Sequence, residues 1–108
     1  MRILFDHVTP SGIAGFLRGR TVTKAKARGW DTLSNGELLD EAERAGFDVV
    51  LTADKNMRYQ QNLKGRRIAL IVSSTPQWPI LRLNTERIAA AVDAATPGSY
   101  VQVEIPPY

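Results

Sequence analysis

Two aspartates stand where short apolar segments of the chain end. Asp6 closes the segment Arg2–Asp6, and Asp54 comes two residues after the apolar run Phe47–Thr52. Two neighbouring carboxylates repel each other unless a cation or a proton lies between them. Oxygen ligands suit Mg²⁺ or Mn²⁺, and such an ion could orient a phosphodiester, activate water and stabilise the developing charge. The alternative is that both acids cap helices or bind backbone amides, and spacing alone favours neither interpretation.

The segments that must position these acids alternate between predicted strands and predicted helices. The strands are expected at Arg2–Asp6, Thr21–Ala25, Phe47–Thr52, Arg67–Val72 and, as an edge strand, Tyr100–Ile105. The helices are expected at Ser11–Leu17, from the N-cap Ser34 to Gly46, at Asn56–Leu63 as a short helix or turn, and at Pro79–Ala95. This alternation predicts an α/β fold with an open, mostly parallel sheet, helices on both faces and right-handed connections.

Ligands of such a sheet bind beyond the carboxyl ends of its strands. That edge is expected to gather two acids, several amides and several hydroxyls, namely Asp6, Thr9, Asn35, Asp54, Asn56 and Ser73–Thr75. Thr9 is expected to cap the helix that follows it, and Ser34 with Glu37 forms a capping box. His7, the one histidine, is either a structural residue, or a proton carrier or metal ligand beside Asp6.

Basic and aromatic residues add a second set of candidates. Lys24, Lys26 and Arg28 are close in sequence and fit either a solvated loop or contacts with phosphate. Trp30 and Trp78 fit either burial or stacking on bases. The net charge of +3 is compatible with a polyanionic partner but equally with an ordinary basic surface.

The composition narrows the class of protein. The 108 residues are 44% hydrophobic and 23% charged, which predicts one soluble globular domain over residues 1–108. The absence of cysteine excludes disulfides and thiolate metal sites. No stretch is apolar for long enough to span a bilayer, and Met1–Asp6 has no signal-peptide pattern. We therefore expect a cytoplasmic protein without a membrane partner.

Several ordered segments resemble the PIN-like nuclease superfamily. These are residues 1–6 (Met-Arg-Ile-Leu-Phe-Asp), 33–39 (Leu-Ser-Asn-Gly-Glu-Leu-Leu) and 46–56 (Gly-Phe-Asp-Val-Val-Leu-Thr-Ala-Asp-Lys-Asn). Residues 59–63 and 65–68 look like a short bacterial branch of unknown function that is related to VapC-type toxins. The resemblance covers roughly residues 1–95 and implies a PIN-like fold.

The resemblance also implies an activity. It implies a ribonuclease that depends on Mg²⁺ or Mn²⁺ and is the toxin of a toxin–antitoxin pair, so that RNA and a cognate antitoxin are the expected partners; a homodimer is left open. Asp6 and Asp54 match the metal-binding acids of the family, and Thr52 is expected to orient Asp54.

The chain departs from the family at Asn35 and Asn56, where relatives commonly carry an aspartate. We expect these two amides to be neutral ligands or substrate contacts, with Thr52 and Lys55 beside them in the substrate-binding set. Fewer carboxylates predict weaker metal binding. The alternative function is therefore a PIN-like module that is catalytically inactive and binds RNA or a partner protein.

Overall fold

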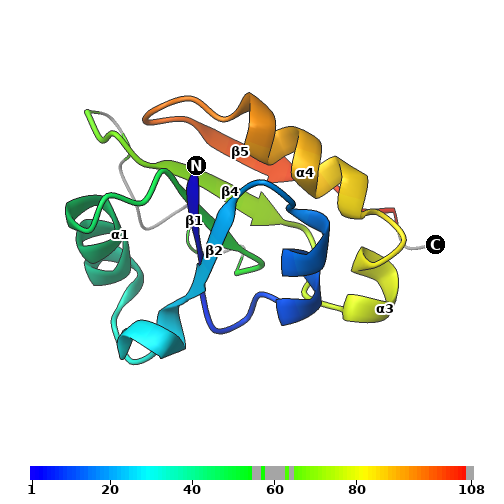
Figure 1. The fold of residues 1–108 in the computed structure, drawn as a ribbon, viewed down its shortest axis with the longest axis horizontal. Helices are drawn as coiled ribbons and strands as arrows, with labels where there is room; N and C mark the ends of the chain where they lie inside the picture. The colour runs from blue at the N-terminus through cyan, green and yellow to red at the C-terminus, as the bar shows by residue number, and fades with distance from the viewer. Residues whose placement is uncertain (55–56, 58–62, 64, 107–108) are drawn as a thin grey trace.

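Five parallel strands form the centre of the molecule in the computed structural model of the chain (Figure 1). The structure describes residues 1–54, 57, 63 and 65–106. The strands lie in the order β2-β1-β3-β4-β5 and comprise β1 (Arg2–Phe5), β2 (Thr21–Lys24), β3 (Val49–Thr52), β4 (Ala69–Ser73) and β5 (Tyr100–Val103). The described helices are the 3-10 helices η1 (Ser11–Phe16) and η2 (Ala25–Arg28) and the α-helices α1 (Asn35–Arg44), α3 (Trp78–Leu81) and α4 (Thr85–Ala94). The predicted open α/β sheet is confirmed.

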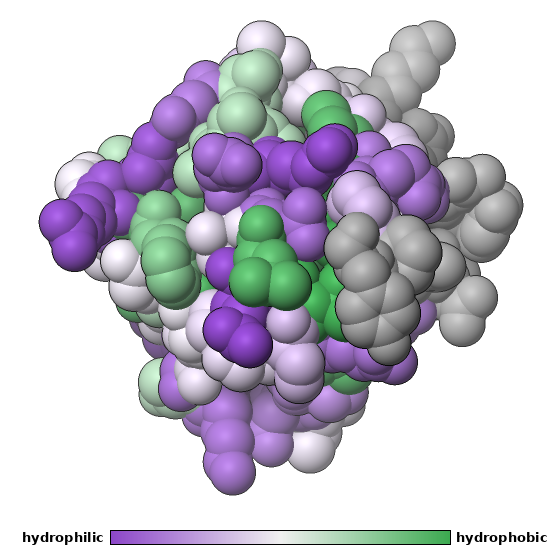
Figure 2. Space-filling view, turned by 90° about the vertical axis from the view of Figure 1, so that its right-hand side faces the viewer, coloured by the Kyte–Doolittle hydropathy of each residue, from purple (hydrophilic) through white to green (hydrophobic). Residues whose placement is uncertain are grey.

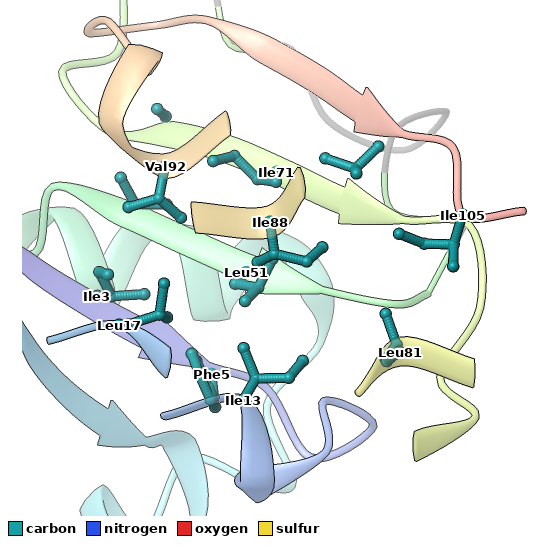
Figure 3. Packing of buried hydrophobic residues seen from close by; sticks show 13 residues of the cluster. Ile3, Phe5, Ile13, Leu17, Leu51, Ile71, Leu81, Ile88, Val92 and Ile105 are labelled. Carbon is teal, nitrogen blue, oxygen red and sulfur yellow. The ribbon is translucent and has the colours of Figure 1, made fainter. Parts of the chain in front are cut away.

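Alternating side chains of the strands form two hydrophobic cores, one on each face of the sheet. In β1, Ile3 and Phe5 belong to one core, whereas Leu4 belongs to the other. Figure 3 shows the first core, in which apolar side chains of η1, α3 and α4 gather over the strands. The second core lies under α1. Burial on both faces explains why every residue of β3 is buried.

The capping box predicted at the start of α1 is confirmed. The Glu37 amide donates to Ser34 Oγ at 3.3 Å, and the Ser34 amide donates to Glu37 Oε1 at 3.0 Å. These bonds satisfy two amides that a helix start leaves without partners. Leu38, Leu39 and Ala42 then lie on the buried side of the helix, so the local signal and the packing agree.

The predicted helix Pro79–Ala95 is two helices, α3 and α4, separated by residues 82–84. The backbone of Asn84 leaves the helical region with φ −133° and ψ 23°. Its side-chain amide donates to the carbonyl of Ile80 at 3.1 Å. Asparagine disfavours a helix interior because its side chain competes for such backbone groups, so the break falls at a position that suits it.

The segment Ser11–Leu17 is also shorter and tighter than predicted. It forms the 3-10 helix η1, in which Gly12 and Gly15 lower the propensity for a longer α-helix. The expected capping role of Thr9 is wrong, because Pro10 is the N-cap and no side chain caps this helix. The Thr9 hydroxyl instead donates to Asp6 at the carboxyl edge of β1.

The prediction that all connections are right-handed is also wrong. η1 connects β1 to β2, and α4 connects β4 to β5, and both helices pack on the face of the first core. β2 and β5 lie at opposite edges of the sheet, so the two connections travel in opposite directions over the same face. They must therefore have opposite hands. The six residues of η1 are too few to cover that face alone, and Ile88 and Val92 of α4 complete it.

Candidate active site

The strand order creates a point at which the chain reverses its direction across the sheet. β1 and β3 are neighbours, but the chain leaves β1 toward one edge and leaves β3 toward the other. In open α/β proteins this reversal opens a crevice where ligands bind. Asp6 follows the last residue of β1, and Asp54 lies two residues beyond the last residue of β3. Both acids are therefore at the carboxyl edge next to the reversal.

Two threonine hydroxyls hold the carboxylate of Asp6. Thr9 Oγ1 donates to Asp6 Oδ1 at 2.6 Å and also lies 2.9 Å from the carbonyl oxygen of Leu51. Thr52 Oγ1 donates to Asp6 Oδ2. The Asp6 residue is only 6% exposed, so these bonds replace most of the water that an exposed carboxylate would bind.

Thr52 connects the two acids. Its hydroxyl oxygen accepts a hydrogen bond from the Asp54 amide at 3.0 Å while its proton is donated to Asp6. The residue is fully buried at the end of β3. The sequence placed Thr52 beside Asp54 as an orienting residue, but the bond to Asp6 was not foreseen. It joins residues 46 positions apart, and no local pattern signals such a pair.

Burial raises the pKa of Asp6 above its ordinary value of 3.8. The hydrogen bonds from Thr52 and Thr9 oppose that rise, as do the charge of His7 and the backbone amide of Val8. Desolvation is the larger effect, so the folded protein holds a proton on Asp6 more readily than an exposed aspartate would. A cation at this carboxylate would favour the ionised form.

A pocket of about 230 Å³ opens beside Asp6. It is lined by acidic, basic and hydroxyl side chains, namely Asp6, His7, Thr9, Ser11, Lys24 and Lys26. His7, Lys24 and Lys26 are exposed, so solvent and ligands can reach them. From the sequence, Lys24 and Lys26 fit either a solvated loop or contacts with phosphate. The structure shows that both line the same pocket as Asp6.

The other predicted residues are placed as follows. Asn35 is the first residue of α1 and is half-buried. Lys55 and Asn56 lie outside the described residues, as does most of the predicted segment Asn56–Leu63. Ser73 and Ser74 bind backbone, because Ser73 Oγ donates to the Thr75 carbonyl at 2.8 Å and Ser74 Oγ accepts from the Ile105 amide at 2.8 Å.

The donors around Asp6 are compatible with a hard divalent cation. Asp6 offers carboxylate oxygens, and the hydroxyls of Thr9 and Thr52 lie beside it. Mg²⁺ keeps several waters and needs only one or two protein carboxylates. Within the described part of the chain, however, no group of three or more histidine, aspartate or glutamate side chains could hold a metal ion. Among the described residues, Asp6 is the acid that lines the pocket.

Fold and site together define an open α/β protein with an acid at the reversal point and a basic pocket next to it. Comparisons with protein-family models, with curated proteins and with solved structures found no match for this chain. In the described portion of the molecule, no helix has the length and apolar character needed to cross a membrane.

Proposed function

We propose that this protein is a metal-dependent endoribonuclease of PIN-like type, with Asp6 and Asp54 as the metal-binding and catalytic acids. The observation that carries the proposal is that one buried threonine, Thr52, hydrogen-bonds to the carboxylate of Asp6 and to the backbone amide of Asp54 at the reversal point of the sheet. The resemblance of the segments around both acids to the PIN-like superfamily supports the same assignment. Mg²⁺ or Mn²⁺, when bound, would supply water activation and charge stabilisation.

The residues of the chain would act mainly by positioning. Thr9 and Thr52 fix the plane of the Asp6 carboxylate through their hydroxyls. Thr52 also fixes the backbone that carries Asp54. Rigid placement of a reacting group is a large part of catalysis, since misplacement by about 1 Å can cost on the order of 100-fold in rate.

The substrate would be RNA, contacted by neutral and basic side chains around the acids. Asn35 at the start of α1 is one proposed contact, with Asn56 and Lys55 as two others beyond the described residues. An amide can hydrogen-bond to a base or a ribose without adding repulsion against phosphate. We further propose a cognate antitoxin as the protein partner, because the resemblance is to toxins of this type.

The test pairs a metal titration with a cleavage assay. Calorimetry with Mn²⁺ on the pure protein should show binding, and fluorescently labelled RNA should be cut only when metal is present. Asp54→Asn should lower cleavage by about ten-fold or more with the fold unchanged, because it keeps the shape but removes a charge. Asp31→Asn, at an exposed acid, is the matched control and should cut like the parent. Equal cleavage by Asp54→Asn and the parent would move the activity to another site.

The toxin assignment has its own experiment. Expression of the chain in a bacterial host should arrest growth, and co-expression of the small open reading frame next to its gene should relieve the arrest. If the Asp54→Asn variant arrests growth as strongly as the parent, the arrest does not come from nuclease activity.

A second candidate function is a PIN-like module that binds RNA or a partner protein without catalysis. Its specific support is that both carboxylate oxygens of Asp6 already accept hydroxyl bonds. The shortage of acidic ligands within the described residues points the same way. RNA binding without cleavage, together with no heat from Mn²⁺, would select this function over the first.

A further inference from the structure

The basic side of the pocket next to Asp6 has no ion-pair partner among the residues that the structure describes. Elsewhere in the described residues, three arginines pair with acids: Arg20 with Asp93, Arg44 with Glu41, and Arg66 with Asp40 and Glu43. Lys24 and Lys26, by contrast, form no ion pair with any residue that the structure describes. Two exposed cations that share a pocket and lack a counter-ion are available to an external anion.

The sheet directs these lysines toward the pocket. Lys24 ends β2 and is the register partner of Phe5, the residue before Asp6. Partners in a parallel register point to the same face, and Phe5 points to the face that η1 covers. Lys26 follows two residues later in η2 and lines the same pocket. The two lysines against the single acid Asp6 leave the lining with one positive charge in excess, counting His7 as neutral (2 − 1 = +1).

Two aromatic residues lie along η1, the helix that begins at the pocket residue Ser11. Ser11 lines the pocket, and Trp78 lies against the next residue, Gly12, so closely that a Cβ there would come within 2.6 Å of the indole ring. Phe16 contacts Trp78 with their ring centroids 6.3 Å apart and is itself 51% exposed. Figure 2, which looks at the side of the molecule toward which β4 and β5 point, shows apolar residues among strongly hydrophilic ones on this side.

We propose that this surface is a nucleotide subsite, in which Lys24 and Lys26 bind a phosphate group and Phe16 with Trp78 stacks the attached base. Cations that follow the backbone and aromatic rings that take the bases are the two elements of single-strand recognition. Ser11 adds a hydroxyl that can donate to a phosphate oxygen. The Asp6 carboxylate is buried, and the hydroxyls of Thr9 and Thr52 already donate to its oxygens. This inference deepens the proposed function, on which it rests for the identity of the polymer, but it does not require catalysis.

The experiment measures binding without metal, so that it is independent of the nuclease proposal. Fluorescence anisotropy of a labelled short oligouridylate is followed in EDTA at increasing salt. The double variant Lys24→Gln/Lys26→Gln should bind at least about ten-fold more weakly, and its log Kd against log salt should be flatter by roughly 0.7 to 1.4. The matched control Arg44→Gln/Arg67→Gln removes two charges from another pocket, at the C-terminal end of α1, and should bind like the parent.

The aromatic part has a separate arm. Phe16→Leu keeps an apolar side chain but removes the ring, and it should weaken binding by about five-fold or more. Phe16→Tyr keeps a ring and should bind like the parent. A blunt RNA duplex should bind less tightly than the single strand, because its bases are already stacked. Labelled oligothymidylate tests whether the ligand is RNA or DNA. Tighter binding of oligouridylate than of oligothymidylate would identify RNA as the ligand, and equal binding would mean that the subsite takes single strands of either kind.

Three results would overturn the subsite. One is unchanged affinity and salt slope in the double lysine variant, and another is an equal loss in the arginine control. The third is displacement of the oligouridylate by poly-glutamate of equal charge at equal concentration, which would make an acidic protein the ligand. Binding is measured in EDTA and cleavage with metal present, so loss of binding and loss of cleavage are separable outcomes. Thermal unfolding of each variant confirms that it is folded.

Discussion

Replacing Thr52 by valine tests the arrangement at the reversal point most directly. Valine has nearly the same shape as threonine and suits a buried strand, but it lacks the hydroxyl. The change removes the bond that Thr52 donates to Asp6 and the bond that it accepts from the Asp54 amide at 3.0 Å. Thr52 is fully buried, so water cannot easily take the place of its hydroxyl beside the Asp6 carboxylate and the Asp54 amide.

The size of the effect follows from those two bonds. A hydrogen bond to a charged group contributes about 1.5 to 3 kcal/mol, and one to a neutral amide contributes about 1 kcal/mol. The two losses share one hydroxyl, so we expect the free energy of unfolding to fall by about 2 to 4 kcal/mol at neutral pH. For a chain of this size, that corresponds to a drop in Tm of roughly 10 to 15 °C.

The pH dependence gives the prediction its sharper form. The Thr52 bond lowers the pKa of Asp6, so its loss must raise that pKa further above 3.8. With a raised pKa the folded state binds the proton more tightly than the unfolded state, and its stability increases as the pH falls. The part of the destabilisation that comes from Asp6 is therefore full at neutral pH and disappears as the pH falls through the folded-state pKa of Asp6. The part from the Asp54 amide persists at all pH values.

Thermal unfolding followed by circular dichroism between acidic and neutral pH measures both parts. Thr23→Val is the matched control, because it makes the same atomic change at a half-buried strand position whose hydroxyl forms no hydrogen bond with any described residue. The control should unfold near the parent temperature. A Thr52→Val protein as stable as the parent, or one equally destabilised at every pH, would refute the assignment of the Thr52 hydroxyl to an ionised Asp6.

Three further predictions test neighbouring features. Asn35→Asp adds a carboxylate at the start of α1, where the helix dipole favours negative charge, so Mg²⁺ or Mn²⁺ should raise the Tm of the variant more than that of the parent; equal shifts would place residue 35 away from the metal. Ser34→Ala removes one bond of the capping box and should cost about 1 kcal/mol in urea unfolding, and no loss would mean that the cap is not formed in solution. Gly12→Ala forces a Cβ against Trp78 and should change the indole fluorescence maximum, while Gly15→Ala, with open space around its Cβ, should leave the spectrum unchanged.

Much of the fold could be predicted because its signals are local. The apolar run Phe47–Thr52 identified a strand that is buried on both faces, although β3 itself begins at Val49. The capping box at Ser34 identified the start of α1 from two residues three positions apart. The sequence did not predict the break at Asn84, because apolar residues recur at helical spacing on both sides of it. The hydrogen bond from the Asn84 side chain to the Ile80 carbonyl is visible only in the structure.

The candidate site was likewise predictable only in its local features. The sequence by itself determined that Asp6 and Asp54 follow strands, since strand ends and chain order are local properties, and parallel strands bring such ends to one edge. Only the tertiary structure decided what these acids touch. Thr52 reaches Asp6 across 46 positions because β1 and β3 became neighbours, and Lys24 lies beside Asp6 because β2 paired with β1. Such contacts depend on which strands pair and on which face each helix covers, and both are set by the burial of the whole chain, not by any single segment.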